Sequence, residues 1–153
     1  MPAKTFEASV RHVPADPRMP RADSVVIIDL RGEINPTAEA DMEKAYEYAT
    51  RQSPIAVLLN FGGVDYINST GIALIARLLS QARILGLRLL AYGLSAHYVE
   101  IFQITRLAEF IEVHADEASA LAAALALAAS EGMTDGSRKA GFGSLAKIIA
   151  SRV

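Results

Sequence analysis

Short apolar runs rich in branched residues alternate along this chain with segments of helical periodicity, and this alternation limits the folds available to it. The segments Ser24–Leu30, Pro54–Phe61 and Leu87–Tyr92 are too short for helices and largely apolar, which is typical of strands buried on both faces. Between them, apolar residues recur at helical spacing over 37–52 and 72–85. Strands that alternate with helices in this way predict an α/β domain with a mixed, mainly parallel sheet.

The remaining elements extend this pattern at both ends. We expect Gly62 and Gly63 to end the second buried strand. We expect Gly86, in the left-handed conformation, to end the helix predicted over 72–85. Four further elements complete the prediction: a strand at Thr5–Val13, a helix from Ser95 to about Thr105, a strand at Phe110–His114, and a helix from Asp116 to about Ser130. The sequence therefore predicts about five strands and four helices.

The two ends of the chain differ in composition. We expect one domain over residues 1–130 and a flexible tail over 131–153, because the tail contains the linker-like segment GSRKAGFGS. The last ten residues carry Leu145, Ile148 and Ile149 as a small apolar stripe, which suits a short helix. The Pro-rich stretch at 14–22 is expected to be a loop.

Composition excludes several classes of protein. Apolar residues make up 52% of the chain, enough for a core, and there is no Cys to form disulfides or a thiolate metal site. The formal net charge of -2 disfavours a dedicated nucleic-acid binder. Because no apolar run approaches the ~18 residues of a membrane span, and the first residues are too polar for a signal peptide, we expect a cytoplasmic protein.

Known catalytic patterns are missing from the sequence. His12, His97 and His114 are far apart and lack metal-ligand spacing, and there is no Gly-rich phosphate loop. The segment 93–97 partly resembles the turn that carries a nucleophilic serine, but its last position is His where Gly is needed, so Ser95 is interpreted as a helix cap. We therefore expect no enzymatic activity, no metal and no cofactor.

One junction stands out on chemical grounds. Asn68 can cap the following helix by accepting a backbone N–H from residue 70 or 71, which leaves the hydroxyls of Ser69 and Thr70 in the first turn. A helix N-terminus carries roughly half a positive charge and tolerates a phosphate. From the residues alone, ordinary capping and a phosphorylation switch at Ser69 both remain open.

Four segments of the chain resemble the motifs of the STAS domain family, the family of bacterial anti-sigma-factor antagonists. The most specific is Val64–Ile72, which is similar to the family pattern ending in Asp-Ser-[Ser/Thr]-Gly. Leu30–Asn35 is similar to the family's Gly-Glu-x-Asp segment, Val57–Phe61 to its following strand, and Phe102–Ile111 to its weaker closing motif. The resemblance covers roughly residues 5 to 130 and implies a single STAS-type domain.

The resemblance implies a function and a set of site residues. In that family an anti-sigma factor with serine-kinase activity binds ATP itself and phosphorylates the serine that corresponds to Ser69; Thr70 is the less favoured acceptor. Phosphorylation abolishes binding of the antagonist, and a phosphatase restores it. The implied phosphorylation and partner-binding positions are Glu33, Asn35, Asn68, Ser69, Thr70, Ala73, Ala76 and Arg77.

Three departures from the family pattern affect this expectation. Asn35 and Asn68 stand where the family has Asp, which keeps a capping oxygen and removes negative charge beside Ser69. Arg106 stands where the family usually has Gly, so this turn either contains a strained left-handed Arg or is built differently.

Two alternative functions remain at this stage. A stand-alone STAS domain also serves as a subunit of a lipid-transport ATPase. A third hypothesis is a small-ligand sensor with an apolar pocket between helix and sheet. Tyr66, Tyr92 and Tyr98 are candidate walls for such a pocket, although ordinary core positions are the favoured interpretation of these tyrosines. The sequence leaves the oligomeric state, monomer or homodimer, open.

Overall fold

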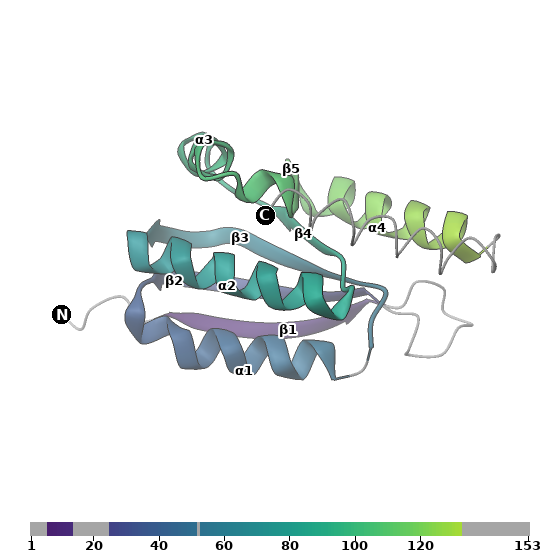
Figure 1. The fold of residues 1–153 in the computed structure, drawn as a ribbon, viewed down its shortest axis with the longest axis horizontal. Helices are drawn as coiled ribbons and strands as arrows, with labels where there is room; N and C mark the ends of the chain where they lie inside the picture. Colours follow the sequence, from purple (N-terminus) through teal and green to yellow (C-terminus); the bar gives the residue numbers. More distant parts are fainter. Residues whose placement is uncertain (1–5, 14–24, 52, 133–153) are drawn as a thin grey trace.

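The computed structural model describes residues 6–13, 25–51 and 53–132, and its centre is a five-stranded sheet (Figure 1). The strands lie side by side in chain order: β1 (Glu7–Val13), β2 (Val25–Ile34), β3 (Ala56–Ile67), β4 (Leu89–Tyr92) and β5 (Glu112–His114). β1 pairs with β2 antiparallel, and every later pair is parallel. The predicted mixed, mainly parallel sheet is confirmed.

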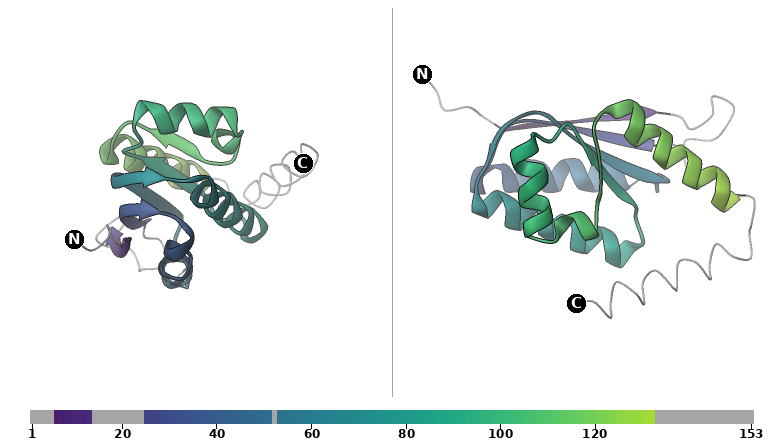
Figure 2. Two further views of the ribbon diagram at one scale, coloured as in Figure 1. Left: turned by 90° about the vertical axis from the view of Figure 1, so that its left-hand side faces the viewer. Right: turned by 90° about the horizontal axis from the view of Figure 1, so that it is seen from above.

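Helices cover both faces of this sheet. The described residues form α1 (Glu39–Thr50), α2 (Ser69–Leu85), α3 (Ala96–Ile104) and α4 (Glu117–Gly132), with short 3₁₀ turns η2 (Pro36–Ala38) and η3 (Leu107–Glu109). The first three helices share one core with the sheet, and α4 packs on the opposite face (Figure 2). The four helices predicted from the sequence are confirmed.

Both faces of the central strands are buried, which explains their nearly continuous apolar sequences. In β2, Val26 and Ile28 enter the core under α1 and α2, whereas Val25 and Ile27 face α4. Each of these side chains is at most 2% exposed, and burying one contributes about 1.5–3 kcal/mol. Phe102 of α3 completes the larger core.

The prediction that Gly62 and Gly63 end the strand is wrong. β3 continues to Ile67, pairing Gly63 with Arg31 and Ile67 with Ile34. Two register shifts interrupt this stretch, and each inserts one extra residue into β3. The inward-facing residues therefore come every third position, at Phe61, Val64 and Ile67.

Other element boundaries also differ from the sequence prediction. β2 runs past Gly32, whose φ of 93° is left-handed, to Ile34. The helix predicted at 37–52 begins with the separate turn η2, whereas α2 begins at Ser69, directly after its predicted cap Asn68. The strand predicted at 87–92 begins at Leu89, and the one predicted at 110–114 begins at Glu112.

Several sequence predictions fall outside the described residues, namely the Pro-rich loop at 14–22 and the tail from 133 onwards. Where the structure does describe the chain, none of its helices has both the length and the apolar character required to cross a bilayer.

Candidate functional site

Because β2, β3 and β4 are parallel, the segments that follow them lie at one end of the sheet. β2 and β3 finish together, at Ile34 and Ile67, and α2 begins immediately afterwards (Figure 1). The backbone N–H of Asn68 donates to the carbonyl oxygen of Ile34 at 3.2 Å. This bond brings the segment around Asn35 beside the turn that carries Ser69.

Asn68 caps α2 as the sequence predicted. Its side-chain Oδ1 accepts the backbone N–H of Gly71 at 2.7 Å, and its backbone is extended, as expected for a cap. Ser69 and Thr70 are exposed in the first turn. The helix ends at Gly86, whose φ of 70° confirms the predicted left-handed cap.

Gly71 allows α2 to start this close to β2. A Cβ at this position would lie 2.2 Å from the carbonyl oxygen of Ile34, far inside van der Waals contact. Gly71 is therefore required by its distance from neighbouring backbone rather than by its own dihedral angles.

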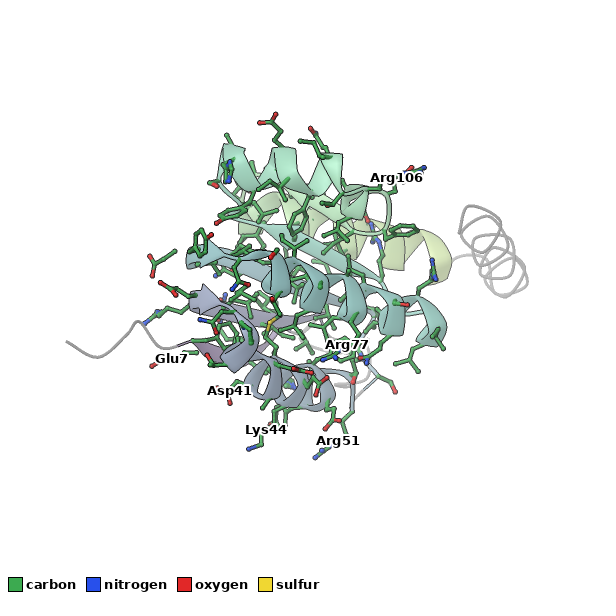
Figure 3. The ribbon with its side chains drawn as sticks, turned by 60° about the vertical axis from the view of Figure 1, so that its left-hand side comes forward. Glu7, Asp41, Lys44, Arg51, Arg77 and Arg106 are labelled. Carbon is green, nitrogen blue, oxygen red and sulfur yellow. The ribbon has the colours of Figure 1, made fainter. Side chains whose placement is uncertain are left out.

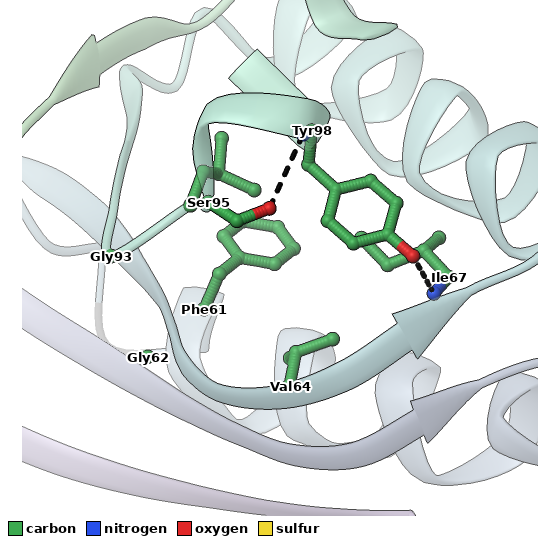
Figure 4. Close-up of a pocket in the computed structure, with 8 residues that line it drawn as sticks. Phe61, Gly62, Val64, Ile67, Gly93, Ser95 and Tyr98 are labelled. Carbon is green, nitrogen blue, oxygen red and sulfur yellow. Dashed lines mark hydrogen bonds between the residues drawn. The ribbon is translucent and has the colours of Figure 1, made fainter. Parts of the chain in front are cut away.

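A second residue fixes the end of β3 from the opposite side. The backbone N–H of Ile67 donates to the hydroxyl of Tyr98 at 2.8 Å, and Tyr98 is only 9% exposed (Figure 4). Ser95 caps α3 by accepting the N–H of Tyr98 at 3.3 Å, as predicted. Between α3 and β3 lies a cavity of about 170 Å³, lined by Phe61, Gly62, Val64, Ile67, Gly93, Leu94, Ser95 and Tyr98.

The Glu33–Asn35 segment completes this end of the molecule. Asn35 caps η2 through Oδ1, which accepts the backbone N–H of Thr37 at 3.0 Å and its hydroxyl at 2.6 Å. Glu33 is half-buried and pairs in register with Tyr66. Tyr66, a candidate pocket wall in the sequence, is 54% exposed and lies three residues before Ser69 in the chain.

The remaining candidate residues lie further along α2. Ala73 is exposed and Ala76 is half-buried. Arg77 is exposed, and its guanidinium contacts Glu39 at 2.6 Å and Glu43 at 2.5 Å, which links α2 to α1 (Figure 3). The core face of α2 contains Leu74, Ile75, Leu78 and Leu79, and the half-buried Ile72 packs against the same core.

A polar network on the other face of the sheet was not predicted. Arg11 of β1 contacts Asp29 at 2.5 Å and Glu117 of α4 at 2.7 Å. Its guanidinium lowers the pKa of both carboxyl groups below their usual values. The hydroxyl of Tyr92 donates to Glu117 at 2.7 Å, and burial raises the pKa of this phenol. These contacts hold the start of α4 on the sheet.

Within residues 6–13, 25–51 and 53–132, no three His, Cys, Asp or Glu side chains are grouped so that they could hold a metal ion.

Arg106 occupies the left-handed region at φ 67°, so the turn contains the strained Arg that was one of the two expectations.

Comparisons with known proteins identify relatives of this fold. The family model described as STAS domain matches residues 16–120. An anti-sigma factor antagonist from Mycobacterium paratuberculosis has a TM-score of 0.54 and 20% identity, over 76% of this chain and 94% of that chain. A proposed anti-sigma factor antagonist from Thermotoga maritima has a TM-score of 0.58 and 16% identity, over 65% and 86%.

A third solved structure is an uncharacterised protein with a SpoIIAA-like fold from Shewanella loihica PV-4. It has a TM-score of 0.53 and 15% identity, over 79% of this chain and 96% of that chain. At such identities these similarities show the fold alone. No curated protein matches the chain.

Proposed function

We propose that this chain, which belongs to the STAS domain family, is a regulatory protein-binding module that antagonises an anti-sigma factor and is switched by phosphorylation of Ser69. Family membership confirms the resemblance seen in the sequence motifs. The observation that carries the proposal is the position of Ser69, exposed at the first residue of a 17-residue helix whose cap is supplied by Asn68.

The proposed docking surface surrounds this serine. It consists of Glu33, Asn35, Asn68, Ser69, Thr70, Ala73, Ala76 and Arg77. We add Tyr66, because an aromatic ring that is 54% exposed is the kind of side chain that anchors protein interfaces. The Ile34–Asn68 hydrogen bond keeps the two halves of this surface together.

Electrostatics explain how a phosphate can act on binding without unfolding the domain. A phosphoserine adds about -1.5 to -2 charge, and the positive end of a helix favours such a group by about 0.3–1 kcal/mol. Asn35 and Asn68, neutral where the family has Asp, add no repulsion. In a docked complex, the same charge facing a surface without a cation is costly, and each ~1.4 kcal/mol lowers affinity tenfold.

The proposed cycle needs two partner proteins. An anti-sigma factor with kinase activity would bind ATP; the Ser69 oxygen would form a bond to the γ-phosphorus, ADP would leave, and the hydroxyl proton would pass to the kinase. A phosphatase would return serine and inorganic phosphate by hydrolysis. We assign this regulatory role, in the cytoplasm and without catalysis of its own, to the domain over 1–130, and a flexible tail with a short helix to 131–153.

The test is a binding experiment with matched variants. The full chain is used to capture anti-sigma kinases of the source organism from lysate, and the captured kinase is then purified. Ser69→Asp is expected to weaken its binding at least tenfold, with the melting temperature within about 2 °C of wild type because the helix dipole accepts the charge. Ser80→Asp, which adds the same charge at an exposed position of the same helix, serves as the control.

Two results would count against the proposal. Equal affinity of wild type and Ser69→Asp for the captured kinase would refute the switch. Stable co-purification with a lipid-transport ATPase, and with no anti-sigma kinase, would replace the proposed function with the transport alternative.

A further inference from the structure

The edge of β3 that faces α3 lacks a strand partner over residues 61–67, more than half of the strand. β4 pairs with β3 only as far as Asn60, which lies opposite Tyr92, whereas β3 continues to Ile67. Backbone N–H groups on this edge must therefore find other acceptors, because a buried N–H without a partner is costly.

Side chains supply these acceptors at both ends of the unpaired stretch. At its start, the N–H of Gly62 donates to Oδ1 of Asn60 at 2.9 Å. At its end, the buried N–H of Ile67 donates to the Tyr98 hydroxyl at 2.8 Å. Tyr98 thus takes the place of the missing strand partner at the last residue of β3.

This contact lies one residue before the cap of the Ser69 helix. On the β2 side, the turn is tied by the Asn68 N–H to the Ile34 carbonyl; on the α3 side, it is tied by Tyr98 through Ile67. Packing supports the α3 side less closely, because the cavity of about 170 Å³ separates the first turn of α3 from Val64 and Phe61 (Figure 4).

We propose that Tyr98 is a positioning residue for Ser69: its hydroxyl holds the end of β3 so that the serine oxygen is presented in the orientation that phosphoryl transfer requires. This inference rests on the proposed function. Transfer rates depend strongly on the alignment of the reacting atoms, and displacement of the attacking group lowers the rate of the step without removing the docking surface. Loss of the Tyr98 hydroxyl should therefore reduce kcat and leave KM nearly unchanged.

The variant Tyr98→Phe tests this without removing the ring. Tyr46→Phe is a matched control, because Tyr46 is also buried, at 5% exposure, and its hydroxyl on α1 has no hydrogen-bond partner among the described residues. Amide hydrogen exchange of the full chain is followed at Asn68 and Gly71, whose N–H groups are both hydrogen-bonded in this turn. We expect exchange at these amides to be at least fivefold faster in Tyr98→Phe and unchanged in Tyr46→Phe.

The second measurement uses the anti-sigma kinase captured by the binding experiment above. Phosphorylation of Ser69 is expected to show a kcat about five- to tenfold lower in Tyr98→Phe, with KM within twofold of wild type and no change in Tyr46→Phe. An unchanged kcat overturns the inference, as does unchanged exchange at Asn68 and Gly71. If exchange in Tyr98→Phe is faster at the amides of β2 as well as at Asn68 and Gly71, the inference is also overturned, because that pattern indicates general destabilisation of the domain.

The two proposals can fail separately. If no anti-sigma kinase is captured, the proposed function fails, while the exchange measurement still decides whether Tyr98 holds the turn. If the kinase binds wild type and Tyr98→Phe and phosphorylates the two at the same rate, the proposed function stands and the role of Tyr98 is refuted.

Discussion

Replacement of Gly71 by Ala separates the effect of helix propensity from the effect of the local structure, because the two have opposite signs. Gly71 lies in the first turn of α2, where Ala would normally stabilise a helix by about 1 kcal/mol. In this fold the added Cβ would lie 2.2 Å from the Ile34 carbonyl oxygen, a distance that real Cβ atoms essentially never show.

The expected cost follows from the movement that is needed. To reach even 3.0 Å, the start of α2 must move by about 0.8 Å from its present 2.2 Å contact. That movement weakens the Asn68–Ile34 hydrogen bond, which is already 3.2 Å long. Overpacking costs about 1–3 kcal/mol and the lost hydrogen bond about 0.5–1.5 kcal/mol. After subtraction of the propensity gain, Gly71→Ala should destabilise the domain by about 2 kcal/mol.

Thermal unfolding followed by far-ultraviolet circular dichroism measures this effect. A loss of about 2 kcal/mol corresponds to a melting temperature lower by about 8 °C for a domain of this size. Thr70→Ala, at the exposed position just before it, is the control and should shift the melting temperature by no more than about 1 °C. A higher melting temperature for Gly71→Ala would show that helix propensity dominates and that the close approach to Ile34 is not maintained.

Two further predictions concern charge and backbone strain. Arg11 lowers the folded-state pKa of Asp29 below its ordinary 3.8 and that of Glu117 below its ordinary 4.5. The two ionised carboxylates therefore stabilise the fold at pH values above these ordinary pKa values, and this stabilisation is lost as the pH falls from there through the lower folded-state pKa values. The melting temperature should therefore fall below about pH 5, and Arg11→Gln should make that decline shallower in a pH series. Arg106→Gly should raise stability by about 1 kcal/mol, because it relieves the left-handed strain at φ 67° and its exposed pair with Glu109 is worth little. Arg106→Ala, which keeps the strain, should show no gain in the same denaturation assay.

Helix ends were predictable from the sequence because their physics is local. Asn68 and Ser95 cap α2 and α3 with their own side chains, and Gly86 takes the left-handed conformation that ends α2. Each of these features depends on residues within one turn. Asn35 and Ser69 lie at the same end of the sheet because parallel strands bring their carboxyl ends together.

The end of β3 could not be predicted in this way. Its bulges follow from pairing with β2. Gly63 pairs with Arg31 and Ile67 with Ile34, and each of these partners lies more than thirty residues earlier in the chain. Two consecutive glycines usually indicate a turn; here Gly63 packs so closely on β2 that a Cβ would lie 3.0 Å from the Leu30 carbonyl oxygen. Only the sheet register shows this use of glycine.

The positions of three tyrosines could not be predicted from the sequence for the same reason. The sequence favoured core positions for Tyr66, Tyr92 and Tyr98 and left pocket walls as the alternative. Tyr92 and Tyr98 are buried, and of the three tyrosines only Tyr98 lines the cavity beside α3. Tyr66 is exposed near Ser69, and Tyr92 joins the α4 network on the opposite face. Their residue type was visible in the sequence, but the strand face and register that separate them were not.

The arrangement at α2 divides structural and chemical roles between adjacent residues. Asn68 satisfies the helix N-terminus through Gly71 and ties the turn to Ile34, so the cap does not depend on the hydroxyl of Ser69. A modification of Ser69 can therefore change the charge of the exposed surface while the cap and the core beneath it remain intact. That separation is what a reversible binding switch requires, because the unmodified and modified forms must both be stably folded and differ only where the partner docks.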